Sequence, residues 1–104
     1  MSFLRSLGWT VDKVEQRLPV VKTTRDCFGF IDVLAIRVGD PGVLAVQATT
    51  EAHLAERVRK VKAEGRAKDW LACGNRIEVH GWARQSRGGR RTFWEPTIVS
   101  FDPV

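Results

Sequence analysis

A single carboxylate lies in the middle of an apolar run in this chain. Residues 28–36 are apolar or glycine except for Asp32, and the run predicts a buried strand. A charge inside an apolar strand is costly unless it is paired or binds a metal. Asp32 therefore needs an explanation that the surface acids do not, and metal binding is the chemistry it suggests.

A second apolar run, residues 43–49, follows across the turn-forming residues 39–42. With Asp40 and Pro41 at the centre of the turn, the hairpin register pairs Ile36 with Ala45, Leu34 with Gln47 and Asp32 with Thr49. Because side chains alternate along a strand, Asp32, Gln47 and Thr49 then share one face. A one-residue slip would flip the second strand. An acid, an amide and a hydroxyl at one end of an apolar hairpin are what a small metal site would present.

Length and composition bound the class of protein. A chain of 104 residues with 43% hydrophobic residues is expected to form one small domain, residues 1–104. No apolar run approaches the ~20 residues of a membrane helix, and the N-terminus lacks a signal-peptide pattern, so we expect a cytoplasmic protein. Seventeen basic against twelve acidic residues give a net charge of +5, which favours a nucleic acid or another polyanion as partner.

The cysteines and histidines do not form a soft-metal site. Cys27 and Cys73 are too few for a ligand set or a disulfide framework, and we expect two small, reduced core residues. His53 and His80 are too scattered for zinc, and His80 is expected to be half-buried on a strand.

The pattern of elements predicts an α/β fold. Residues 9–18 are ambiguous, but their β-branched residues favour a strand that Pro19 ends. A helix should begin at Thr50 and bury Leu54, Val58 and Val61. The other expected elements are a helix at 2–8, strands at 27–37 and 43–49, a helix end at Gly65, a short helix at 67–72, a strand at 76–82, a basic loop at 85–91 and a last strand at 92–101. This order predicts an α/β fold, a mixed β-sheet of about five strands flanked by helices.

The order of elements and two short motifs resemble the PD-(D/E)XK nuclease superfamily. The first motif is Arg-Asp-x-Phe-Gly-Phe-x-Asp at 25–32, and the second is Val-Gln-Ala-Thr at 46–49. The likeness extends from about residue 9 to 101 and is greatest to small Holliday-junction-resolvase-like and phage or restriction-type endonucleases.

The resemblance implies a role for each motif residue. Asp32 matches the first metal-binding acid, Gln47 occupies the (D/E) position, and the backbone carbonyl of Ala48 would be a further ligand of Mg²⁺ or Mn²⁺. Thr49 stands where the family carries its catalytic lysine, which is a departure from the pattern.

A cation from another element would have to replace that lysine. The candidates are Arg57 and Lys60 on the helix that follows, and Lys22. Glu15 would supply the upstream acid that the family carries on its first helix.

These residues predict a Mg²⁺-dependent DNA endonuclease that hydrolyses phosphodiester bonds. The alternatives are a catalytically inactive nucleic-acid-binding module on the same fold, and an interaction protein that binds no nucleic acid. Structural explanations also stay open: Asp32 as an acid paired with Arg25 or Arg57, and Gln47 as a plain sheet residue.

DNA contacts are expected from the arginines of the basic loop, Arg84, Arg87, Arg90 and Arg91. The basic residues of the helix after Thr50 are by default a solvated face. Trp94, beside the loop, could stack on an unpaired base, although a core position is the more common one. A homodimer is expected, with Trp82 and Trp94 as interface material.

Overall fold

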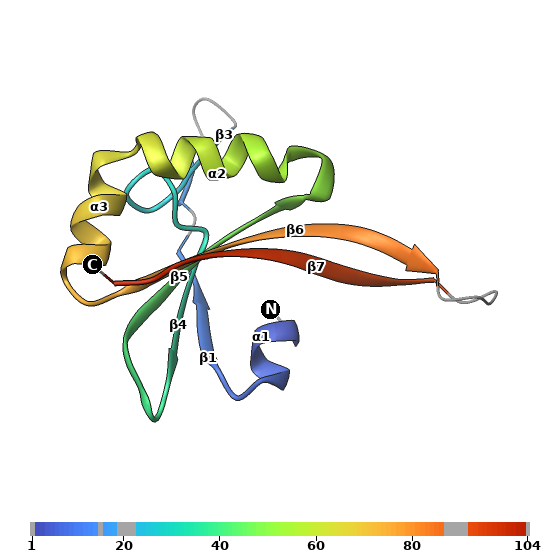
Figure 1. Cartoon of the computed structure of the whole chain (residues 1–104), viewed down its shortest axis with the longest axis horizontal. Helices are drawn as coiled ribbons and strands as arrows, with labels where there is room; N and C mark the ends of the chain where they lie inside the picture. The colour runs from blue at the N-terminus through green and yellow to red at the C-terminus, as the bar shows by residue number, and fades with distance from the viewer. Residues whose placement is uncertain (1, 15, 19–22, 87–91, 104) are drawn as a thin grey trace.

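A five-stranded mixed β-sheet forms the centre of the molecule, and helices cover both of its faces (Figure 1). The computed structural model describes residues 2–14, 16–18, 23–86 and 92–103, with the backbone alone for 16–18 and 23–25. The α/β class and the mixed sheet predicted from the sequence are confirmed.

The sheet order is β1-β4-β5-β6-β7, in which only β5 and β6 are parallel. The strands are β1 (Thr10–Lys13), β4 (Val33–Arg37), β5 (Asp40–Thr50), β6 (Arg76–Ser86) and β7 (Thr92–Phe101). The helices are α1 (Ser2–Ser6), the 3-10 helix η1 (Glu51–His53), α2 (Leu54–Ala63) and α3 (Gly65–Ala72). The helices between β5 and β6 form the long connection that parallel neighbours require.

Two hydrophobic cores hold the helices to the sheet. On one face Ala45, Ile77 and Val79 pack with Val61 and Ala67 of α2 and α3. Leu54 and Val58 join this core, so the predicted apolar face of the helix is confirmed. On the other face Leu4 of α1 and Trp9 pack with alternate residues of β4 and β5: Val33, Ala35, Leu44 and Val46.

The predicted register of the central hairpin is wrong by two residues. The ladder pairs Leu34 with Ala45 and Val33 with Val46, and the turn is Val38-Gly39 rather than Asp40-Pro41. Gly39 has φ +95°, which suits a tight turn, and Arg37 and Asp40 pair across it. Because the error is an even number of residues, Gln47 and Thr49 stay on the face that was predicted to be shared.

The prediction of a continuous strand from residue 27 is also wrong, because residues 27–31 form a closed loop and β4 begins only at Val33. Phe28 and Gly29 both have positive φ, +53° and +79°, which no strand residue adopts.

The helix ends differ from expectation in two places. The Thr50 side chain makes no capping hydrogen bond; its hydroxyl lies 2.7 Å from Nδ1 of His53. Gly65 begins α3 rather than ending a helix, and α2 has already ended at Ala63.

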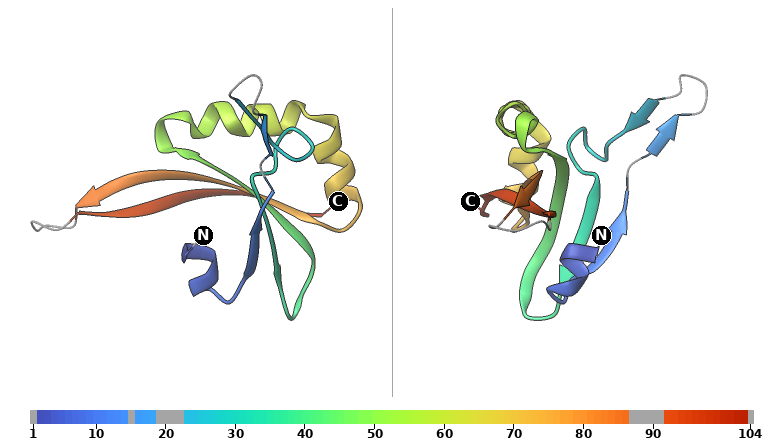
Figure 2. Two further views of the ribbon diagram at one scale, coloured as in Figure 1. Left: turned by 180° about the vertical axis from the view of Figure 1, so that it is seen from behind. Right: turned by 90° about the vertical axis from the view of Figure 1, so that its right-hand side faces the viewer.

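Two two-stranded ribbons extend from the body of the molecule. β2 (Gln16–Leu18) and β3 (Thr23–Arg25) pair only with each other, and in the right-hand view of Figure 2 they stand away from the sheet. The sequence analysis did not predict them as a pair. The far ends of β6 and β7 form the second ribbon, which projects beyond the other strands (Figure 1).

Two side chains are buried differently from expectation. Cys73 is exposed and Cys27 is partly buried, and both are free thiols, so the expected core position is wrong for Cys73. His80 is fully buried rather than half-buried. Its Nε2 lies 2.8 Å from Glu78 Oε1, and its ring meets the edge of Phe3.

Candidate functional site: two loop carboxylates against strand β5

A closed loop brings two aspartates to the same place. Cys27 and Ile31 form an isolated antiparallel bridge, with N–O distances of 3.0 and 2.9 Å. Asp26 and Asp32 flank this bridge, so they leave the loop on neighbouring stretches of backbone. The left-handed Phe28 and Gly29 make the reversal possible.

Asp32 is held against the backbone of β5. Its Oδ2 accepts a hydrogen bond from the Ala48 N–H at 3.0 Å, and its own N–H donates to the Val46 carbonyl at 3.0 Å. The β4–β5 ladder ends at the pair Val33 and Val46. Beyond it the Asp32 carboxylate takes the place of a backbone carbonyl and accepts from the Ala48 N–H of β5. In a strand the N–H and C=O of one residue point toward the same neighbouring strand. The Ala48 carbonyl therefore also points to the side on which Asp32 lies.

Asp26 is held against Gln47, the residue of β5 that precedes Ala48. Gln47 is only 3% exposed, and its Nε2 donates to Asp26 Oδ2 at 3.3 Å. A buried amide needs such a partner. The two acids of one loop thus dock on two consecutive residues of β5, and the Gln47 amide is used as a donor while its carbonyl oxygen stays an acceptor.

These groups fit an oxygen-binding cation. Mg²⁺ takes oxygen ligands, keeps several waters and is commonly held by one or two carboxylates together with substrate phosphate. The donors present are the carboxylates of Asp26 and Asp32, the Gln47 carboxamide and the Ala48 carbonyl. In the described part of the chain no group of three or more His, Cys, Asp and Glu side chains could hold a metal ion. A cation held by two carboxylates, one carboxamide and one backbone carbonyl would keep coordination positions for water or phosphate.

Of the cations expected to replace the lysine, Arg57 and Lys60 lie on α2, and Lys60 is engaged elsewhere. Lys60 pairs with Glu56 at 3.4 Å on the exposed side of α2. Arg57 is partly buried on α2, and among the described residues no ion pair joins it to an acid. Thr49 lies opposite Gly81 of β6, on the face that packs against Leu54.

Two predicted site residues, Glu15 and Lys22, lie outside the described residues. A basic residue that the sequence analysis did not consider lies near the site. Lys13 of β1 is paired with Val33 of β4, and the next residue, Val14, donates its N–H to the Asp32 carbonyl at 2.9 Å.

The predicted DNA contacts fall on the ribbon of β6 and β7. Arg84 is exposed, and its guanidinium lies 5.5 Å from the ring centre of Trp94, which is 59% exposed. Arg87, Arg90 and Arg91 lie outside the described residues. Trp82 packs edge-on against Phe3 and is only partly exposed. Of the two tryptophans expected at an interface, Trp94 is therefore the more exposed.

Asp26 is the site residue that the sequence analysis missed. The signal was Gly29, because a glycine inside a strand pattern often marks a turn or bulge. A turn centred on Gly29 brings residues on either side of it together, and the two acids at 26 and 32 flank it symmetrically.

None of the helices in the part of the chain that the structure describes has the length and apolar character needed to cross a membrane. A comparison of the chain with profiles of protein families, with curated proteins and with solved structures finds no match.

Proposed function

We propose that this chain is a Mg²⁺- or Mn²⁺-dependent DNA endonuclease domain of the PD-(D/E)XK type, like the Holliday-junction-resolvase-like enzymes that its motifs resemble. Asp32, the Ala48 carbonyl and the Gln47 carboxamide oxygen would hold the cation, with Asp26 beside them. The bound cation would lower the pKa of a water ligand and neutralise charge on the scissile phosphate.

The observation that supports this proposal best is the docking of Asp26 and Asp32 on Gln47 and Ala48. Both acids come from one short loop, and both meet the strand segment that carries the second motif. One carboxylate would be enough to satisfy the buried amide of Gln47. The second carboxylate at the neighbouring position is not explained by that structural need. The sheet order, with three antiparallel strands followed by a helical connection to a parallel strand, agrees with the resemblance.

A second candidate function is a nucleic-acid-binding module that lacks catalysis. Thr49 in place of lysine favours it, because threonine cannot supply a positive charge to the transition state. The engagement of Asp32 by the Ala48 N–H also gives that acid a purely structural use.

Cleavage assays with the Asp32→Asn variant test the proposal. Wild type and variant are incubated with a four-way junction, a linear duplex and a supercoiled plasmid, with Mg²⁺, with Mn²⁺ and with chelator. We expect metal-dependent cleavage by the wild type and a loss of about 100-fold or more in the variant, because asparagine keeps the shape but loses the charge that holds the cation. DNA binding by the variant, measured with chelator, should be unchanged within about twofold.

Asp102→Asn is the matched control, since it removes an exposed acid and should cleave like the wild type. A wild type that binds DNA but cuts no substrate in either metal contradicts the nuclease proposal and leaves the binding module. A wild type that neither binds nor cuts DNA contradicts both.

Two further expectations belong to this proposal. Homodimerisation would allow one chain to act on each DNA strand, with the exposed ring of Trp94 as interface material. A cytoplasmic location would give the protein access to DNA.

A further inference from the structure

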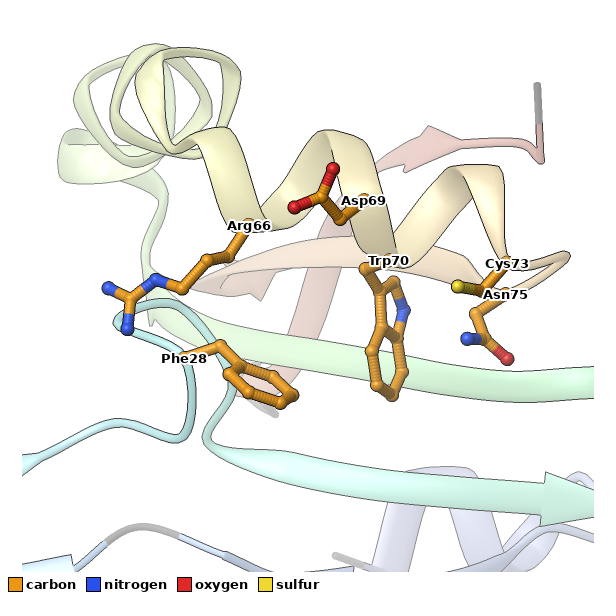
Figure 3. Close-up of a pocket in the computed structure, with 6 residues that line it drawn as sticks. All are labelled: Phe28, Arg66, Asp69, Trp70, Cys73 and Asn75. Carbon is orange, nitrogen blue, oxygen red and sulfur yellow. The ribbon is translucent and has the colours of Figure 1, made fainter.

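An aromatic pocket lies beside the loop that carries the two aspartates. Its cavity measures about 200 Å³, and its walls are Phe28, Arg66, Asp69, Trp70, Cys73 and Asn75. Figure 3 shows the rings of Phe28 and Trp70 next to each other under α3, with Arg66 reaching from the start of that helix toward the loop. The ring centres are 6.4 Å apart and inclined by 57°.

Phe28 presents its ring to solvent from an unfavourable backbone conformation. It is the only non-glycine residue with positive φ in the described chain, and such a conformation is a genuine outlier for a bulky residue. Its side chain is nevertheless 49% exposed, so burial of the ring does not explain why phenylalanine occupies this position. Strain of this kind is common where a side chain has to be presented to a ligand.

Trp70 provides a second, fixed aromatic wall. Its indole N–H donates to the Arg76 carbonyl at 2.9 Å, and its ring packs on Phe30 of the core. The orientation of the indole is therefore set by the protein, and the ring can receive a flat ligand without losing rotational freedom of its own.

The polar wall of the pocket combines a cation with groups that suit a heterocycle. Arg66 donates to Glu64 at 2.8 Å, and this hydrogen bond raises the pKa of the Arg66 guanidinium. One of its terminal nitrogens lies 2.7 Å from where a Gly29 Cβ would be, so the guanidinium rests on the same loop. The Asp69 carboxylate can accept from an exocyclic amine of a base, as acidic side chains do in DNA readout.

The size and place of the pocket point to one base. Its volume is below the ~300–1,000 Å³ of pockets for drug-sized ligands, which suits a single ring system. Phe28 lies in the closed loop between Asp26 and Asp32, so a strand with a phosphate at these acids has a neighbouring base within reach of the ring. An aliphatic ligand would use the rings but leave Arg66 and Asp69 without a role.

We propose that this pocket binds one unpaired nucleobase of a DNA strand by stacking on Phe28 and Trp70. The inference rests on the proposed function, because the base belongs to the strand whose phosphate lies at the aspartates. It gives the site a preference for single-stranded or branched DNA over a closed duplex, since a base inside a duplex is already stacked on both sides.

A test combines the Phe28→Gly variant with abasic DNA. Glycine accepts a φ of +53° without strain, so the variant removes the ring without straining the loop. Binding to a short single-stranded oligonucleotide is measured in Ca²⁺, which takes oxygen ligands as Mg²⁺ does, first unmodified and then with one abasic residue at each position in turn. Stacking on one base is worth enough that we expect the wild type to lose about 5- to 150-fold in affinity at one abasic position. Phe28→Gly should bind the unmodified strand correspondingly weaker and should not respond to that abasic residue.

Leu7→Ala is the matched control, because Leu7 is as exposed as Phe28, at 50%, and lies outside the pocket; it should behave like the wild type. Equal binding of Phe28→Gly and wild type, an abasic scan without effect on the wild type, or no binding of single strands at all would each overturn the pocket proposal. Because binding and not cleavage is measured, these results do not depend on catalysis. A protein that never cuts DNA but shows the abasic response would keep the pocket and lose the nuclease.

Discussion

Gln47 shows how a single side chain decides what this site can do. Its amide donates to Asp26. In the proposed nuclease site a carboxylate would stand at this position, so the amide supplies a donor that satisfies a neighbouring acid in place of a negative charge. Metal affinity should consequently be weaker than in a site with a third carboxylate.

Gln47→Glu should destabilise the metal-free protein and increase its response to metal. The new carboxylate would be buried 3.3 Å from Asp26 Oδ2, where two like charges repel and a buried hydrogen bond is lost. We expect a loss of about 1–3 kcal/mol in the free energy of unfolding without metal. Binding of Mg²⁺ or Mn²⁺ to the folded state should restore part of it. Urea unfolding with chelator and with each metal measures both effects.

The double variant Asp26→Asn with Gln47→Glu is the control for this prediction. It exchanges the acid and the amide, so one donor and one acceptor again face each other, and most of the stability should return without metal. If Gln47→Glu alone is as stable as the wild type and does not respond to metal, Asp26 and Gln47 do not form a cation site.

At the scale of elements, the hairpin of β4 and β5 is fixed at its turn by a cluster around Asp40. Asp40 pairs with Arg37 at 2.6 Å and with Arg76 of β6 at 3.4 Å. Both guanidinium groups lie over the ring of Trp9, at 4.2 and 5.4 Å from its centre, and Arg37 also donates to the Leu7 carbonyl. One carboxylate thus ties the turn to β6 and to the segment that follows α1.

This cluster should make stability depend on pH in the acid range. The hydrogen bond from Arg37 lowers the pKa of Asp40 from its ordinary value of 3.8. A lowered pKa in the folded state means that the contribution is complete above the ordinary value and is lost as the pH falls through the lowered one. Asp40→Asn should therefore lower the thermal midpoint near neutral pH and should match the wild type once Asp40 is protonated.

Thermal unfolding of both proteins, at about pH 7 and at decreasing pH below about 4, measures this difference. The exposed pair Lys60–Glu56 offers a control, because Glu56→Gln removes an ordinary surface ion pair of small effect. A difference between Asp40→Asn and wild type that stays constant down to the lowest pH would show that charge on Asp40 is not its cause.

At the scale of the whole molecule, the site and the exposed ribbon belong to different parts of one continuous sheet. β5 carries the site, and its neighbour β6 continues past it into the ribbon with Arg84 and Trp94. In the proposed nuclease, Arg84 on the ribbon would contact the phosphate backbone, and the carboxylates on the β4 side of β5 would lie away from that contact. Affinity and chemistry would then be separated, because phosphate contacts position a nucleic acid without taking part in the reaction.

Replacement of Arg87, Arg90 and Arg91 by Gln should weaken DNA binding to all sequences alike. Each phosphate contact contributes about 0.9 to the slope of log affinity against log salt, so the triple variant should lower that slope by up to about 3. Titrations of a labelled duplex between about 50 and 200 mM salt measure it. Lys60→Gln together with Lys62→Gln and Lys68→Gln removes three charges from the helices instead, and an effect confined to this second variant would place the DNA-binding face there.

The sequence by itself determined the class of fold and most of its elements. The apolar face of α2 at Leu54, Val58 and Val61 and the last strand at 92–101 follow from local periodicity, which depends only on how far apart residues are along the chain. Gln47 and Thr49 were also correctly placed on one face, because alternation in a strand survives a register error of two residues.

Only the tertiary structure decided what the site contains. Asp26 lies 21 residues before Gln47 and Asp32 lies 16 residues before Ala48, and nothing in local periodicity fixes such pairs. They depend on the left-handed turn at Phe28 and Gly29, which folds the expected strand back on itself. They depend equally on the turn at Val38-Gly39, which sets where the two strands meet. Hydrogen bonds of a few ångströms between distant residues require the whole backbone path between them, and that path exists only in the folded chain.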